Sequence, residues 1–148
     1  MPRVNRIRVS NIRMDGGMKV LGDKIWEPNG LNTVFLLENG GGKTSIIQLL
    51  LQVVLPNYSI KERPLKKTVG KGSSINVAVE WLPDTEDKPL FVTGFSFHNY
   101  GVKQGNLNKT YDYYSYIAEY DSDDSYKIET LPFVTGDQFT TFSNLKNF

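Results

Sequence analysis

The chain opens on a segment in which apolar and polar side chains alternate. In residues 5–13, Ile7 and Val9 share one face and arginines occupy the other, which predicts a half-buried strand. Residues 18–26 follow a tight glycine turn and are expected to return antiparallel to that strand. The pattern therefore predicts an N-terminal β-hairpin.

A longer apolar stretch follows, interrupted by glycines. Residues 33–37 form a short apolar run rich in β-formers, which predicts a buried strand. Residues 44–55 are almost entirely apolar and stop at Pro56, which predicts a buried helix. The glycines at 40–42 separate the two, so the expected order is strand, glycine-rich loop, helix.

The second half of the chain returns to alternation. Residues 75–81 place Ile75, Val77 and Val79 on one face, as expected for a strand. The next predicted strands are residues 90–97, 111–120 and 126–134, separated by turn-forming segments. Together they predict an antiparallel β-meander.

The last residues carry a helical stripe. Phe139, Phe142, Leu145 and Phe148 are spaced three apart, which predicts the start of a helix. Because the stripe is cut at the last residue, we expect a parent chain that continues further. We therefore divide the chain into a lobe, residues 1–136, and a helix start, residues 137–148.

Composition and charge limit the kinds of site and ligand that this chain can have. The 148 residues are 39% hydrophobic, enough for a packed core, and they include no Cys, which excludes disulfides and thiolate sites and fits a cytoplasmic protein. No apolar run reaches membrane-spanning length, so we expect no membrane partner. Residues 1–71 hold 12 Lys or Arg against 5 Asp or Glu, whereas residues 72–148 hold 5 against 11. The basic half suits a polyanionic ligand.

The segment Leu37-Glu38-Asn39-Gly40-Gly41-Gly42-Lys43-Thr44 explains why a polyanion is expected there. It matches a phosphate-binding loop, glycine, four free residues and Gly-Lys-Ser/Thr, except that Leu37 replaces the first glycine. Three glycines let backbone amides point inward at a helix start. Lys43 is expected to reach the β- and γ-phosphates, and the Thr44 hydroxyl to bind Mg²⁺. The alternative is a glycine turn that only caps the helix.

Two of these segments carry a family resemblance. Residues 6–13 and 38–44 resemble motifs in the N-terminal half of the ATPase head of SMC-type proteins, including MukB-like and DNA-repair members. The resemblance implies an α/β fold: an ABC-ATPase-like P-loop lobe with an N-terminal β-hairpin, a strand–P-loop–helix unit and an antiparallel meander. It also implies that the terminal helix leads to a coiled coil.

The resemblance carries roles over to named residues. Arg13 would reach the nucleotide phosphates, and Asn39 would shape the loop near the γ-phosphate. A glutamine that contacts magnesium in the family would be Gln138 or, less well placed, Gln104. The candidate nucleotide-binding residues are Arg13, Glu38, Asn39, Gly40, Gly41, Gly42, Lys43, Thr44 and Ser45, and the candidate DNA contacts are Arg63, Lys66 and Lys67.

The second half of the family's machinery is missing from the chain. There is no Ser-Gly-Gly signature and no apolar strand ending in Asp-Glu; Val77-Ala78-Val79-Glu80 is the nearest sequence. The resemblance therefore implies partners: the C-terminal lobe of the same head, a second head, and DNA. We expect a cytoplasmic protein, nucleoid-associated if bacterial, that binds ATP weakly on its own and scarcely hydrolyses it.

Two other functional classes remain open. A self-contained P-loop NTPase or kinase would need helices alternating with parallel strands and a second acidic motif. A binding module could use the tyrosine-rich residues 111–120 to stack nucleic acid, although the acidic residues Asp112, Glu119 and Asp121 would repel phosphates. His98, the single histidine, lacks metal-ligand companions in the sequence.

Overall fold

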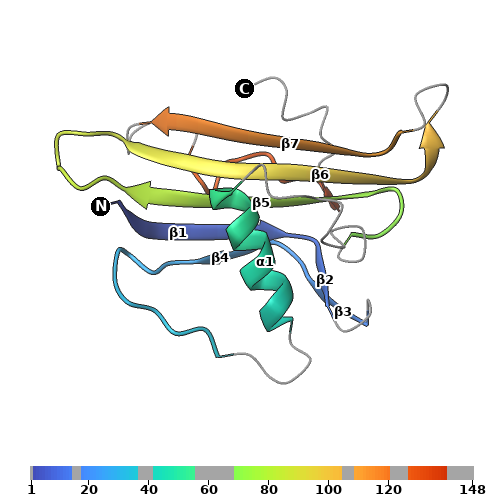
Figure 1. Ribbon diagram of the computed structural model, residues 1–148, viewed down its shortest axis with the longest axis horizontal. Helices are drawn as coiled ribbons and strands as arrows, with labels where there is room; N and C mark the ends of the chain where they lie inside the picture. Colours follow the sequence, from blue (N-terminus) through green and yellow to red (C-terminus); the bar gives the residue numbers. More distant parts are fainter. Residues whose placement is uncertain are drawn as a thin grey trace.

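The computed structural model describes residues 2–14, 18–36, 42–55, 69–104, 109–120 and 127–139. A five-stranded antiparallel sheet in the order β4-β1-β5-β6-β7 forms its centre (Figure 1). These strands are β1 (Arg3–Ser10), β4 (Lys24–Trp26), β5 (Ser73–Leu82), β6 (Leu90–Gln104) and β7 (Lys109–Tyr120). The N-terminal hairpin and the meander of β5, β6 and β7 are thus confirmed.

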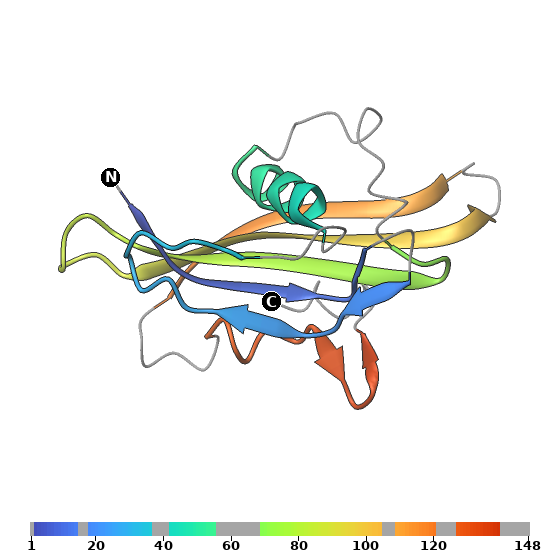
Figure 2. The same cartoon turned by 90° about the horizontal axis from the view of Figure 1, so that it is seen from below.

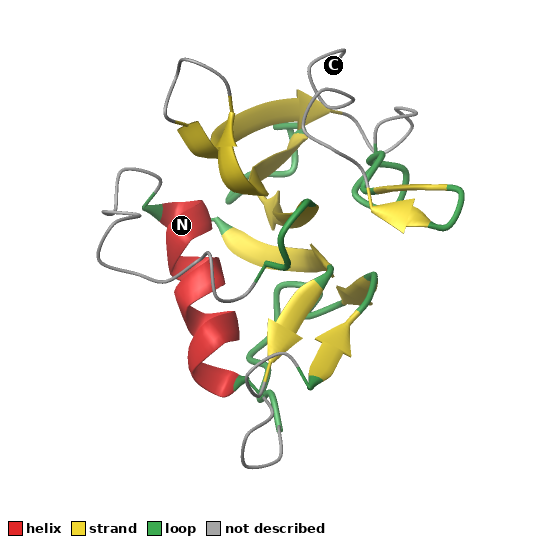
Figure 3. Cartoon of the chain, turned by 90° about the vertical axis from the view of Figure 1, so that its right-hand side faces the viewer, coloured by secondary structure: helices red, strands yellow, loops and turns green. Residues whose placement is uncertain are grey.

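Shorter elements surround the sheet. Strand β2 (Ile12–Met14) pairs with β3 (Lys19–Leu21), and β8 (Val134–Thr135) pairs with β9 (Gln138–Phe139). One helix, α1 (Lys43–Val54), completes the part of the chain that is described (Figure 3). It begins one residue before the predicted start and ends one residue before the predicted end, but it is only partly buried, because Ile47, Leu51 and Val54 are exposed.

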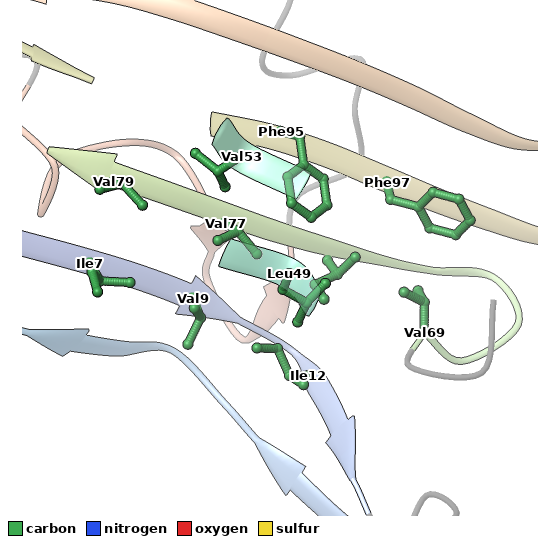
Figure 4. Packing of buried hydrophobic residues seen from close by; sticks show 11 residues of the cluster. Ile7, Val9, Ile12, Leu49, Val53, Val69, Val77, Val79, Phe95 and Phe97 are labelled. Atoms are coloured by element: carbon green, nitrogen blue, oxygen red, sulfur yellow. The ribbon is translucent and has the colours of Figure 1, made fainter. Parts of the chain in front are cut away.

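Helix α1 lies across one face of the sheet (Figure 2). Its buried residues, Ile46, Leu49, Gln52 and Val53, recur at helical spacing, so they form one stripe. The stripe contacts the alternating apolar residues of the central strands (Figure 4). The buried members of this cluster, which we call the α1-side core, are Ile7, Val9, Ile12, Leu49, Val53, Val69, Ile75, Val77, Val79, Phe95 and Phe97.

The opposite face of the sheet is covered by residues 127–139 (Figure 2). A smaller apolar cluster, the far-side core, consists of Ala78, Val92, Ile128, Leu131 and Phe133. Polar contacts also hold this segment on the sheet. Arg8 donates from Nη1 to the carbonyl oxygens of residues 128, 129 and 131 at 2.8–2.9 Å, and Phe133 lies under its guanidinium. The covering segment is therefore held by an arginine located about 120 residues earlier in the chain.

The α/β fold class expected from the phosphate-loop pattern is wrong. Every strand pair in the described residues is antiparallel, and only one helix is present among them. Residues 33–36 form no strand, and Val34 and Leu36 are 82% and 90% exposed. A short apolar run cannot by itself distinguish a buried strand from an exposed connection. Consequently the strand–loop–helix unit of an ABC-ATPase-like lobe is not formed.

The predicted C-terminal elements also differ from the structure. Residues 127–133 form turns instead of a strand. Their backbone carbonyls accept hydrogen bonds from Arg8, and Ile128, Leu131 and Phe133 pack onto the sheet face. The boundary between residues 136 and 137 falls inside the β8–β9 hairpin, and residues 138–139 form a strand instead of a helix. Residues 140–148 lie outside the described part. No helix in the described ranges is long and apolar enough to cross a membrane.

Candidate functional site

The start of α1 is the described part of the predicted phosphate loop. Gly42 is the N-cap in the left-handed conformation, with φ 80° and ψ 20°, and its carbonyl accepts the first helical hydrogen bond from the Ile46 amide at 2.9 Å. The amides of Lys43, Thr44 and Ser45 precede that bond and have no partner within the helix. Within the described residues, no side chain caps this end and no acidic residue stands in the first turn. No side chain of the described residues therefore offsets the positive end of the helix dipole.

The side chains of the motif are presented to solvent. Lys43 and Thr44 are exposed, and Ser45 is half-buried. An ammonium group and a hydroxyl beside unbonded amides can bind a phosphate and a magnesium ion in the way a phosphate loop does. Residues 37–41, which include Glu38, Asn39, Gly40 and Gly41, lie outside the described part, as do Arg63, Lys66 and Lys67.

Gly42 touches strand β2. A Cβ atom added to Gly42 would lie 2.6 Å from Met14 Cγ and closer still to Met14 Sδ. Met14 also packs against the α1-side core. The contact, together with the left-handed φ, explains why glycine is required at this position.

Arg13 lies at the same end of the molecule but points elsewhere. In strand β2 it alternates with the core residues Ile12 and Met14, so its side chain leaves the opposite side of the strand. The guanidinium packs against Gly70, where an added Cβ would lie 2.6 Å from Nη2. The structure brings Met14, not Arg13, into contact with the helix start.

The glutamine candidates are not beside Thr44. Gln138 is exposed in β9, and the β8–β9 hairpin lies on the face of the sheet opposite α1 (Figure 2). Gln104 is the last residue of β6. Among the described residues no three His, Cys, Asp or Glu side chains form a metal-binding group. Of the predicted metal ligands, Thr44 alone belongs to the helix start.

Glu80, the closest sequence equivalent of a catalytic glutamate, has a structural role. It is fully buried and accepts hydrogen bonds from Arg6 Nε and Nη2 at 2.7 Å and from Asn5 Nδ2 at 2.6 Å. It also shares the face of Ala78, away from α1. A water-activating role at the helix start is therefore excluded for this residue.

A polar row crosses three strands on the far side of the sheet, and the sequence did not indicate it. Ser74, His98 and Asp112 stand opposite one another in β5, β6 and β7. His98 Nδ1 lies 2.9 Å from Ser74 Oγ, and the Tyr100 hydroxyl donates to Asp112 Oδ2 at 2.5 Å. Burial lowers the pKa of His98, and the charge of Asp112 partly opposes that shift.

These residue types would suit nucleophilic catalysis, but the geometry does not. Ser74 is 2% exposed, so a substrate cannot reach its hydroxyl. The row joins other buried polar contacts between strands, in which Asn76 donates to Ser10 and Ser96 donates to Asn76. Alternation alone would have placed these side chains on one face, but not their pairing.

No protein-family model, curated protein or solved structure matches this chain. A functional assignment therefore depends on the residues at the helix start and on their surroundings.

Proposed function

We propose that this chain binds ATP with Mg²⁺ at the start of α1, as the N-terminal part of an SMC-like ATPase that acts on DNA. One observation carries the proposal: α1 begins at Gly42-Lys43-Thr44, with a left-handed glycine, no side-chain cap in the described residues, and both functional side chains exposed. Glycine at position 42 is already accounted for by its left-handed backbone and by the Met14 contact, so the Lys43-Thr44 pair at the helix start carries the argument for a phosphate ligand. The sequence motif and the local geometry thus support the same ligand.

The charges around this end agree with an anionic ligand. Lys43 stands in the first turn of α1, and the exposed Lys19 is the cross-strand partner of Met14, which contacts Gly42. A local excess of positive charge raises the concentration of a polyanion near the site. The helix start and the sequence motif support nucleotide binding, whereas the antiparallel sheet gives no support for it.

Hydrolysis is proposed to need groups from outside the chain. Glu80 is engaged by Arg6 and Asn5 on the other face of the sheet, and no acidic group of the described residues stands in the first turn of α1. The C-terminal lobe of the same head and a second head would supply the missing acid and signature. The antiparallel sheet speaks against a self-contained P-loop NTPase or kinase.

An exposed apolar surface supports the proposed protein partners. The outer side of α1 and the connection before it carry large apolar side chains that contact solvent: Leu31, Val34, Leu36, Ile47, Leu51, Val54 and Leu55. Large apolar side chains exposed together on one side of a helix, as Ile47, Leu51 and Val54 are on α1, are typical of protein–protein contacts. We propose that the remainder of the ATPase head covers it, and that the parent works on DNA in the cytoplasm, at the nucleoid in a bacterium.

The decisive experiment is a calorimetric titration with ATP and Mg²⁺. We expect the wild type to bind and Lys43→Ala to weaken binding by at least about tenfold, because one charge-assisted contact contributes roughly 1.5–3 kcal/mol. Lys24→Ala, an exposed lysine on β4, is the charge-matched control and should bind like the wild type. Equal affinities for wild type and Lys43→Ala would refute the proposal.

A further inference from the structure

Met14 is the side chain on which the helix start rests. It comes from β2, is half-buried and packs against the α1-side core. Its Cγ and Sδ stand so close to Gly42 that a Cβ there would overlap them. Met14 thus connects the β2–β3 pair to Gly42, the residue before α1, through an apolar contact.

The position of Gly42 decides where the phosphate-binding amides point. Its left-handed conformation turns the chain into α1, and the amides of Lys43, Thr44 and Ser45 follow directly. Because no side chain among the described residues caps this end, packing has to hold it in place. Ile46 and Leu49 hold the helix from one side of the first turns, and Met14 holds Gly42 itself.

We propose that Met14 is a positioning residue for the phosphate site at the start of α1. The proposal rests on the nucleotide binding proposed above and deepens it. Met14 has no group that binds phosphate, yet its thioether sets the distance between β2 and Gly42. An unbranched, polarisable side chain suits this narrow space beside a backbone. Loss of such support loosens a site that depends on preorganised amides.

Two variants of Met14 and one control separate positioning from general stability. Met14→Ala removes the support, whereas Met14→Leu keeps most of its volume. Met18→Ala is the matched control, because Met18 precedes β3 in the same hairpin and is 81% exposed. Gly42→Ala is unsuitable as a test, since the φ of 80° would strain any other residue.

The primary measurement is ATP affinity with Mg²⁺, recorded together with the melting temperature. We expect Met14→Ala to bind about tenfold more weakly, as when a supporting contact behind a binding group is removed. Met14→Leu and Met18→Ala should stay within about twofold of the wild type. If Lys43→Ala weakens binding but Met14→Ala does not, the positioning role is wrong and the proposed function stands. If Lys43→Ala has no effect, both proposals fail.

A second measurement does not require a variant to fold. Peroxide converts exposed methionines to sulfoxides, and mass spectrometry follows each site separately. Saturating ATP should slow oxidation of Met14 at least about threefold, because a bound nucleotide fixes the helix start over it. Oxidation of Met18 should be unchanged and serves as the internal control. Equal Met14 rates with and without ATP would overturn the proposal.

Discussion

The two faces of the sheet are covered by different kinds of contact. On one face, α1 packs through Leu49 and Val53 onto apolar side chains, and Gln52 donates a hydrogen bond to the Tyr113 hydroxyl at 2.9 Å. On the other face, the segment 127–139 adds charged and polar contacts to a small apolar cluster. Apolar packing is non-directional, whereas hydrogen bonds to named carbonyls fix one arrangement.

This difference has a consequence for function. Helix α1 is held along its buried stripe, and no side chain among the described residues caps its N-terminal amides, where we propose that the ligand binds. The opposite segment has its carbonyls taken up by Arg8 and its Glu129 engaged by Arg6 at 2.6 Å. The α1 side is thus suited to binding, and the far side to holding the fold together.

Removing Arg8 should be the strongest way to break the far side. Its side chain is 5% exposed and forms a two-point ion pair with Asp23, with N–O distances of 2.7 and 2.9 Å, besides the carbonyl contacts. Arg8→Ala leaves these acceptors without a donor, so we expect the free energy of unfolding to fall by about 4 kcal/mol. Urea denaturation measures the change.

The control for this variant stands on the same strand. Arg3 is exposed in β1, and Arg3→Ala should change the free energy of unfolding by no more than about 0.5 kcal/mol. Combining Arg8→Ala with Asp23→Asn should cost less than the sum of the single changes, since the two residues share one contact. Strict additivity would show that the ion pair does not stabilise the contact between β1 and the turn before β4.

Removing Leu49 tests the apolar side in the same way. Leu49 is 1% exposed on the buried side of α1. Because Leu49→Ala leaves a cavity, we expect the free energy of unfolding to fall by about 3 kcal/mol. Leu51→Ala on the exposed side of the same helix is the matched control, expected within about 0.5 kcal/mol. Salt should leave the Leu49→Ala loss unchanged, because no charge is involved. Similar losses for both leucines would contradict the assigned orientation of α1.

The sequence predicts the α1 side better than the far side, for a physical reason. Period-two alternation in residues 75–81 and the apolar run of residues 44–55 are local patterns, and the strand and the helix that they predict both appear in the structure, although one side of the helix is exposed. The fastening of residues 127–133 depends on Arg8, which no local pattern links to them. The wrong prediction of a buried strand at residues 33–36 has the same origin, because a short apolar run does not by itself indicate whether other residues pack over it.

The candidate site likewise has parts that the sequence predicted and parts that depend on tertiary packing. The motif at Gly42, Lys43 and Thr44 predicted a helix start, and α1 begins there with Lys43 and Thr44 exposed; their roles toward phosphate and magnesium stay predictions. The contact between Met14 and Gly42 joins positions 28 residues apart and has no sequence signature. Arg13 was assigned to the phosphates by resemblance, whereas strand alternation turns it toward Gly70. The motif thus predicted which side chains stand at the helix start, whereas the tertiary packing determines which residues contact them.

The smallest expected effect is a pH dependence that belongs only to the far side. Burial lowers the pKa of His98 below its ordinary value of 6.5, so at mildly acidic pH the unfolded chain binds a proton more readily than the folded one. Stability from this group is therefore complete above about pH 7 and decreases as the pH falls through 6.5. The cause is local: Ser74 and Tyr100 crowd the ring, and Asp112 only partly compensates.

The variant His98→Gln isolates this contribution from that of the carboxylates. Glutamine keeps a polar group near Ser74 but does not titrate, so the decrease in the free energy of unfolding between pH 7 and pH 5 should be smaller than in the wild type. Leu49→Ala should retain the wild-type pH dependence, because Leu49 lies on the other side of the sheet. Urea denaturation at both pH values measures the slopes. An identical slope in His98→Gln would show that the polar row on the far side does not sense protons, and a reduced slope in Leu49→Ala would show that the two faces are coupled.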